Sequence, residues 1–166
     1  MEKYTLGTTK LLVQGWQKKI LKELKYDNKT IEDIALLVEQ HLRPHTFKMG
    51  WTDSAVRRYI VDAGHMLEDL NELVRADVTT KNKAKAKEIY ENLDEMEKRI
   101  EEVKAKEELS KIRPALSGDE VMEHFNIQPG PKVGVIMKAL YEQRINDGEV
   151  SKEDALKLAE ETYKNL

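Results

Sequence analysis

The sequence predicts an all-α fold, and three observations lead to this prediction. Apolar residues recur at helical spacing along the chain, and no segment alternates polar and apolar residues long enough to form a strand. One stretch of about 30 residues contains neither Gly nor Pro and is rich in Ala, Lys, Glu and Leu, which favour helices. Charged residues make up 36 % of the chain and hydrophobic residues 40 %, which is typical of a helical protein rather than a disordered one.

The long stretch, at about 80–109, predicts one helix that connects the parts of the chain before and after it. At about 1.5 Å per residue it would be a rod of roughly 45 Å, too long for the core of one small domain. Its apolar residues form one narrow stripe, at Ile89, Leu93, Met96, Ile100 and Val103. We therefore expect a helical body at 1–79, a connecting helix at 80–112 and a small helical tail at 113–166.

Four lysines stand at the start of this helix before any acidic residue: Lys81, Lys83, Lys85 and Lys87. The N-terminus of a helix already carries a partial positive charge, so these lysines oppose the helix dipole. Two interpretations remain open. The lysines form a solvated charged face, or they meet an anionic partner such as phosphate, which would offset both charges.

Four helices are expected in the body, at 8–25, after Thr30, at 54–63 and at 65–76. In the first, an apolar face is expected to point inwards and comprises Leu11, Leu12, Trp16, Ile20, Leu21 and Leu24. Thr30 is expected to cap the second helix, which stops at Arg43-Pro44. The third helix should bury its apolar residues and expose Arg57 and Arg58.

In the tail, Pro114 marks a boundary, and Ser117 and Ser151 are expected to cap short helices, the last at 152–164. Between them, Gly130 can adopt a positive φ, and Pro131 suits the first turn of a helix that reaches about Asn146. Free backbone N–H groups at 132–134, with the charge of Lys132, could then bind a backbone phosphate. The alternative is a simple turn between packed helices, in which Gly134 allows close helix contact.

Several classes of chemistry lack their motifs. The chain has no Cys, and no HExxH, GxSxG or P-loop pattern occurs. A metal-dependent hydrolase would have to use His41, His45 and Asp77, although Pro44 interrupts the helix between the two histidines. No apolar run approaches the length of a membrane span and the N-terminus does not resemble a signal peptide, so we expect no membrane contact and a cytoplasmic location. Because the net charge is −3, any nucleic-acid binding must come from a local patch.

Five segments carry a resemblance to a known family: IEDIALLVEQHLRPH (31–45), WTDSAVRRYIVDAG (51–64), RADVTTKNKAKA (75–86), EELSKIRPALSGDEVMEHFNIQPGPKVG (107–134) and GEVSKEDAL (148–156). In order and spacing, residues 31–166 resemble the C-terminal body and tail of bacterial CCA-adding tRNA nucleotidyltransferases, of the poly(A) polymerase-like superfamily. Residues 1–30 resemble, more weakly, the helices that precede this region.

The resemblance implies the part of such an enzyme that holds tRNA. The family's catalytic head carries paired aspartates, and its neck carries a Glu-Asp-x-x-Arg motif; neither is found here. Hence we expect no catalytic residue, no metal and no cofactor in this chain, since Mg²⁺ and nucleotide would belong to the missing head, and whether the chain is an enzyme stays open. The resemblance implies shape and charge recognition of the tRNA acceptor and TΨC arm. The candidate RNA-binding residues are Arg57, Arg58, Lys81, Lys83, Lys85, Lys87, Arg113, Gly130 and Lys132.

An alternative function is a protein-interaction module. In that hypothesis the apolar stripe of the long helix docks on a separately encoded catalytic head, on another partner or on a second copy of the chain.

Overall fold

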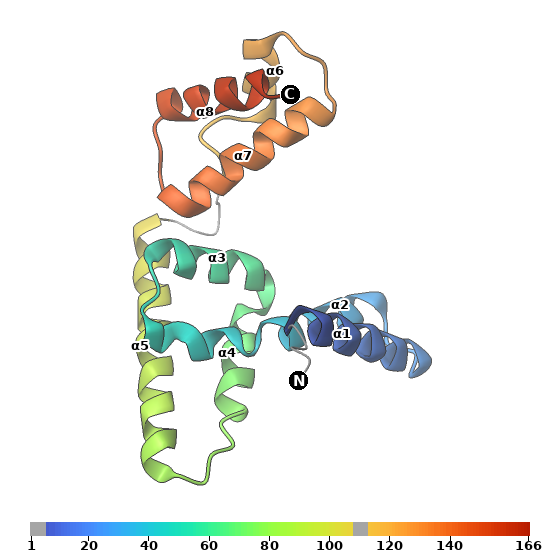
Figure 1. The fold of residues 1–166 in the computed structure, drawn as a ribbon, viewed down its shortest axis with the longest axis vertical. Coiled ribbons are helices and arrows are strands. Elements are labelled where there is room, and N and C mark those ends of the chain that lie inside the picture. The colour runs from blue at the N-terminus through green and yellow to red at the C-terminus, as the bar shows by residue number, and fades with distance from the viewer. Residues whose placement is uncertain (1–5, 108–112) are drawn as a thin grey trace, which may run out of the picture. The chain divides into compact units, whose positions relative to one another are not determined.

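The computed structural model describes residues 6–107 and 113–166. Every regular element in these residues is helical, which confirms the predicted all-α class (Figure 1). Among the described residues, no helix is both long and apolar enough to cross a membrane. The elements are α1 (Leu6–Glu23), α2 (Asn28–Gln40), η1 (Arg43–Met49), α3 (Asp53–Ala63), η2 (Gly64–Met66), α4 (Leu67–Ala76), α5 (Lys83–Glu107), α6 (Gly118–Phe125), α7 (Pro131–Asp147) and α8 (Lys152–Lys164).

The chain divides into two compact units that do not follow its sequence order. Unit 1 comprises Met1–Gly50 and Ile60–Glu97, and unit 2 comprises Trp51–Tyr59 and Lys98–Leu166. The helices α3 and α5 each contribute residues to both units. This grouping is by contacts and differs from the division expected at 1–79, 80–112 and 113–166. That division into domains stays a prediction.

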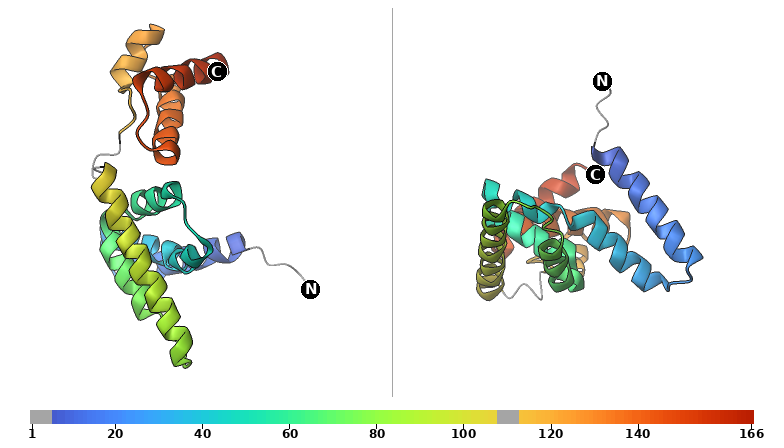
Figure 2. Two further views of the ribbon diagram at one scale, coloured as in Figure 1. Left: turned by 90° about the vertical axis from the view of Figure 1, so that its left-hand side faces the viewer. Right: turned by 90° about the horizontal axis from the view of Figure 1, so that it is seen from below.

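In unit 1, α1 packs on α2, and α2 packs on α4 (Figure 2). The turn between α1 and α2 is fixed by Asp27, whose carboxylate accepts from the Thr30 backbone N–H at 3.0 Å and from the Thr30 hydroxyl at 2.6 Å. These two hydrogen bonds lower the pKa of Asp27. Asp27 and not Thr30 therefore caps α2, because the extended backbone of Asp27 places its carboxylate over the first turn.

The connecting helix α5 is present but begins at Lys83, three residues later than expected. The cause is Asn82, whose side-chain oxygen accepts from the backbone N–H groups of Ala84 at 3.0 Å and Lys85 at 3.2 Å. Asn82 thus acts as the helix cap, and Lys81 lies outside the helix. The stripe is largely buried: Leu93, Met96, Ile100 and Val103 are at most 3 % exposed, and Ile89 is half-buried.

In unit 2, the short helices α6, α7 and α8 enclose a core of Leu116, Val121, Ile136, Leu140, Ala155 and Ala159. Ser117 and Glu120 form a reciprocal capping box at α6, as predicted. Ser151 caps α8 through the Asp154 backbone N–H at 3.1 Å, also as predicted. The C-terminal helical tail is therefore confirmed.

Burial of the α5 stripe predicts a large stability effect for Met96, whose side chain is fully buried. Met96→Ala should lower the free energy of unfolding by about 2–5 kcal/mol, because it removes buried apolar volume and leaves a cavity. Urea denaturation followed by circular dichroism would measure this change. Glu95→Ala, at the exposed neighbouring position, should stay within about 0.5 kcal/mol of wild type. Equal effects of the two changes would contradict burial of the stripe in this chain.

Candidate nucleic-acid interface

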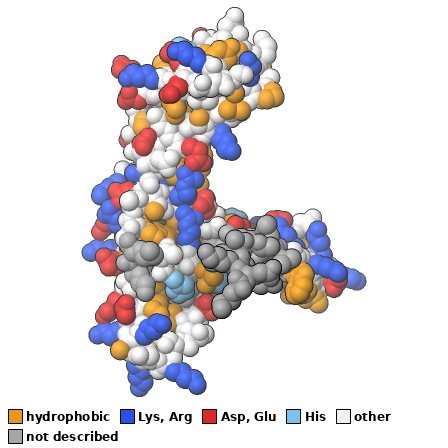
Figure 3. Space-filling view, viewed as in Figure 1, with side chains coloured by type: hydrophobic (Ala, Val, Ile, Leu, Met, Phe, Trp, Pro, Cys, Tyr) orange, Lys and Arg blue, Asp and Glu red, His pale blue; other side chains and the backbone are white. Residues whose placement is uncertain are grey.

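The lysines at the start of α5 do not form a single row. Lys83 and Lys87 are four residues apart and share a helix face, whereas Lys85 lies on the side that carries the stripe farther along. All three, and Lys81 before the helix, are exposed. Positive side chains gather at the tip of unit 1 where α5 begins (Figure 3). The lysines therefore present charge in more than one direction around this tip.

Little within unit 1 neutralises these lysines. The first turn of α5 contains no acidic residue. Among the described residues, no carboxylate pairs with Lys81, Lys83 or Lys85, and Lys87 has only a long contact with Glu91, at 3.6 Å, with both side chains mostly exposed. An exposed pair of this kind contributes little to stability. The tip thus keeps nearly its full positive charge at the positive end of a helix dipole.

Arg57 is not an exposed residue as expected, because its side chain is buried in unit 2 and the residue is only 7 % exposed. Its guanidinium donates to the backbone carbonyl oxygens of Ile145 at 2.9 Å and Asn146 at 3.1 Å. These carbonyls lie in the last turn of α7, where they have no partner within the helix. A guanidinium there satisfies them and carries the charge that the helix C-terminus favours, so Arg57 is structural.

Arg58 is half-buried rather than fully exposed, and it is also engaged. Its guanidinium pairs with the Glu142 carboxylate at 2.6 Å, which lowers the pKa of Glu142. It also approaches the Asn146 side-chain oxygen at 3.4 Å. Like Arg57, it attaches α3 to α7 inside unit 2, which sequence periodicity could not show.

The turn before α7 differs from its expected geometry. Pro131 does open the helix, but Gly130 has a φ of 171°, an extended backbone that any residue can adopt, so it does not use the positive φ open to glycine. A Cβ at Gly134 would meet nothing within 4 Å, so this glycine does not mark close helix contact. The Gly134 N–H already donates to the Gly130 carbonyl at 3.2 Å, which leaves the N–H groups of residues 132 and 133.

Lys132 is exposed, and its ammonium group lies 5.4 Å from the centre of the Tyr163 ring, a cation–π contact. Arg113 is exposed just before α6. Both belong to unit 2, whereas the α5 lysines belong to unit 1. The structure therefore assembles the candidate residues into separate groups, one in each unit.

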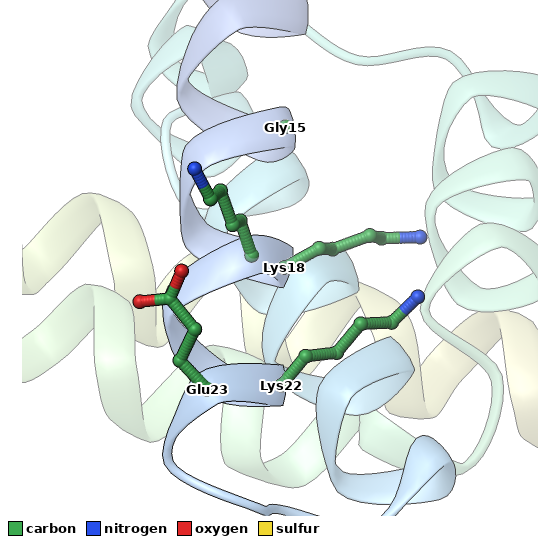
Figure 4. A pocket seen from close by; sticks show the side chains of 5 residues that line it. Gly15, Lys18, Lys22 and Glu23 are labelled. Carbon is green, nitrogen blue, oxygen red and sulfur yellow. The ribbon is translucent and has the colours of Figure 1, made fainter.

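A second group of lysines, not singled out as a site from the sequence, lies on α1. A surface depression of about 450 Å³ is lined by Gly15, Lys18, Lys19, Lys22 and Glu23. Lys18 and Lys22 extend to one side of the helix, and Glu23 points away from them (Figure 4). Lys18 is paired with Glu32 at 2.9 Å. Lys18 and Lys22 are four residues apart in the sequence, and this spacing was the signal that they share a helix face.

The hypothesis of a metal site at His41, His45 and Asp77 is wrong. Within the described ranges 6–107 and 113–166, no group of three or more His, Cys, Asp or Glu residues could hold a metal ion. The ring of His41 instead contacts the Val38 carbonyl oxygen through Nδ1 at 2.8 Å. His41 is thus part of the C-terminal turn of α2.

These features define an all-helical chain with a local positive patch on an otherwise acidic molecule. Residues 9–159 match the model of the family described as tRNA nucleotidyltransferase domain 2. The chain belongs to this family, which confirms the resemblance seen in the sequence.

The chain is similar to part of two longer proteins. It is 33 % identical over 132 residues to a CC-adding tRNA nucleotidyltransferase from Thermus thermophilus, covering 80 % of this chain and 28 % of the relative. It is 29 % identical over 127 residues to an A-adding tRNA nucleotidyltransferase from Deinococcus radiodurans, covering 75 % of this chain and again 28 % of the relative. The chain thus matches less than a third of the length of either relative. No solved structure matches the chain.

The buried position of Arg57 predicts that it matters for stability more than Arg58 does. Arg57→Ala should lower the free energy of unfolding by about 1.5–3 kcal/mol, because the buried carbonyl oxygen of Ile145 and the partly buried one of Asn146 lose their charged donor. Arg58→Ala removes a half-exposed ion pair and should cost about 1 kcal/mol or less. Thermal unfolding of both variants measures the difference. An Arg57→Ala variant as stable as wild type would show that Arg57 does not hold α3 to α7.

Proposed function

We propose that this chain binds tRNA through its backbone phosphates, mainly with the lysines at the start of α5. The observation that carries the proposal is the uncompensated charge of Lys81, Lys83 and Lys85 at a helix N-terminus, for which no partner occurs among the described residues. Phosphate is the ligand that offsets both the lysine charges and the helix dipole. The names of the two relatives, both tRNA nucleotidyltransferases, make tRNA the RNA of choice.

The mode of binding follows from the charge distribution. The net charge of −3 gives no general attraction to RNA, so attraction must be local to the patch. Lysine ammonium groups bind phosphates as point charges and do not read bases. We propose that they hold the acceptor and TΨC arm by shape and charge, as the family resemblance implies.

Not every candidate residue is retained. Arg57 leaves the proposed interface because it is buried against α7. Arg113 and Lys132 remain proposed contacts of unit 2, since both are exposed. Arg58 and Gly130 remain secondary, the first because it is paired with Glu142 and the second because only its backbone could contribute.

We propose that the 166 residues of this sequence bind RNA and do not catalyse nucleotide transfer by themselves. The sequence offers no paired strand-borne aspartates, and the matched relatives are more than three times as long as the matched region. Mg²⁺ and nucleotide would then be held by a separate catalytic head. The proposal places this role in the cytoplasm, where tRNA matures.

The salt dependence of tRNA binding tests the patch. Each phosphate contact contributes about 0.9 to the slope of log K against log salt concentration. The double change Lys83→Gln with Lys87→Gln should therefore weaken binding and reduce the slope by about 1.5–2. Filter binding of a tRNA transcript between 50 and 200 mM salt, roughly the range over which phosphate contacts lose affinity, measures both quantities.

A matched control lies on the same helix. Lys98 and Lys106 are both exposed, and Lys98→Gln with Lys106→Gln removes the same charge farther along α5. This control should leave the slope unchanged. The same loss in both double variants would point to general charge attraction, and an unchanged slope in the Lys83 and Lys87 variant would remove the patch from the interface.

A second candidate function is partner docking, and α1 rather than α5 favours it. The α5 stripe is buried within the chain, so it offers no docking surface. On α1, by contrast, Trp16, Ile20 and Leu24 were expected to point inwards but are 73, 55 and 64 % exposed. Leu11 and Leu12 of the same expected face lie outside the residues whose side chains are described.

Within the described residues 15–24, the polar side chains of Gln17 and Lys18 are half-buried while three large apolar side chains are exposed. Leu21 and Gln17 are half-buried, and the buried amide oxygen of Gln17 has no hydrogen-bond partner among the described residues. Trp16, Ile20 and Leu24 recur every four residues and form an exposed apolar ridge. An exposed ridge of this kind marks an interaction surface.

We propose that the ridge receives a separately encoded nucleotidyltransferase head. The match spans 28 % of each relative, so most of each relative lies outside the matched region. An apolar ridge with aliphatic side chains suits a protein surface better than RNA.

Co-expression with a head from the same genome tests this docking. Size-exclusion chromatography with light scattering should show a one-to-one complex, and Trp16→Glu should abolish it because a charge enters the apolar contact. Val135→Glu is the matched control, because Val135 is an exposed apolar residue on α7. Separate elution of the wild-type chain and the head, or a complex that survives Trp16→Glu, would contradict docking on α1.

A further inference from the structure

An exposed aromatic side chain continues the lysine face of α5. Tyr90 is 40 % exposed and lies three residues after Lys87 and seven after Lys83. Residues at these spacings lie on one face of a helix. The face therefore presents two ammonium groups and then an aromatic ring, within about 11 Å along the helix axis at 1.5 Å per residue.

The hydroxyl of Tyr90 makes one long contact with the neighbouring helix α4. It donates to the backbone carbonyl oxygen of Arg75 at 3.5 Å. Arg75 is itself fixed on α5, because its guanidinium donates to Glu97 at 2.7 and 3.0 Å and to Asp94 at 2.6 Å.

The sign of the charge on this face changes at Tyr90. Lys83 and Lys87 precede it, whereas Asp94 and Glu97 follow it, with one arginine between two carboxylates. The Asp94 side chain is 67 % exposed. Phosphates are therefore attracted by the lysines before Tyr90 and gain no comparable attraction from the paired cluster after it. A nucleic-acid strand bound to the lysines would end or turn at the tyrosine, where a base can leave the stack.

We propose that Tyr90 stacks on an unpaired nucleobase of the RNA whose phosphates Lys83 and Lys87 hold. This inference rests on the proposed tRNA binding and assigns it a second kind of contact. Stacking on an aromatic ring is tolerant of base identity, and it depends on a base free from a duplex. The contact would favour RNA with an unpaired end or loop over a continuous duplex.

The lysine and tyrosine contacts have different signatures in a binding titration. Loss of a phosphate contact lowers the salt slope, whereas loss of stacking lowers affinity at every salt concentration and leaves the slope unchanged. Tyr90→Leu keeps apolar volume but removes the aromatic face, and Tyr90→Phe keeps the ring but removes the hydroxyl. The two variants separate stacking from the hydrogen bond to Arg75.

The experiment measures filter binding of two probes, a tRNA transcript and a blunt-ended RNA duplex of two complementary strands, which has no unpaired base. Tyr90→Leu should weaken tRNA binding about tenfold or more with an unchanged salt slope, and it should leave duplex binding near wild type. Tyr90→Phe should bind tRNA within about threefold of wild type. Circular dichroism of the full chain checks that each variant folds.

Three results would overturn the inference. The first is that Tyr90→Leu binds tRNA as tightly as wild type. The second is that it loses affinity for tRNA and duplex equally, which would assign Tyr90 the structural role of holding α5 to α4. A reduced salt slope in Tyr90→Leu would show that it acts by displacing the lysines. Failure of the proposed function looks different: the wild-type chain would then bind neither probe, or the Lys83 and Lys87 variant would keep the full slope.

Discussion

The burial of the α5 stripe is the constraint on which the candidate interface depends. Leu93, Met96, Ile100 and Val103 leave water together, and a narrow stripe can be buried in only one rotation of the helix about its axis. That rotation fixes the direction of every other side chain on α5. Lys83, Lys87 and Tyr90 face outwards because they lie away from the stripe. The charged tip is therefore positioned by the apolar contacts farther along the same helix.

The cationic residues divide by chemistry as well as by position. Four arginines make contacts that join helices. Arg57 donates to carbonyl oxygens of α7, and Arg58 pairs with Glu142. Arg75 pairs with two carboxylates of α5, and Arg99 pairs with Asp53 and Glu102. A planar guanidinium can satisfy two acceptors at once, which suits it to fixing helices together. The lysines at the start of α5 make no such contacts among the described residues and stay solvated. This explains why a count of basic residues overestimates the surface that a polyanion could use.

Both kinds of exposed surface fit a chain that matches 28 % of the length of two tRNA nucleotidyltransferases. A helical region that holds RNA needs solvated cations, which α5 supplies. In the proposed docking on a catalytic head, the exposed ridge of α1 would supply the apolar contact. The two surfaces lie on different helices of unit 1, so one chain could make both contacts. The two proposed functions, RNA binding by α5 and partner docking by α1, therefore do not need the same surface.

The sequence by itself determined the helical class, the long helix, the caps at Ser117 and Ser151, and the family, since these depend on local propensity, spacing and residue identity. The buried stripe of α5 also followed from periodicity, whereas tertiary packing decided the buried face of α1 and the burial of Arg57. Periodicity placed Trp16 inside and Arg57 outside, whereas α1 packs by the face of Leu21 and Arg57 fills the end of α7. A helix with more than one apolar or amphipathic face has no unique buried side until a neighbour covers one of them. For the same reason, Tyr90 became a candidate only once the α5 stripe had fixed the rotation of its helix.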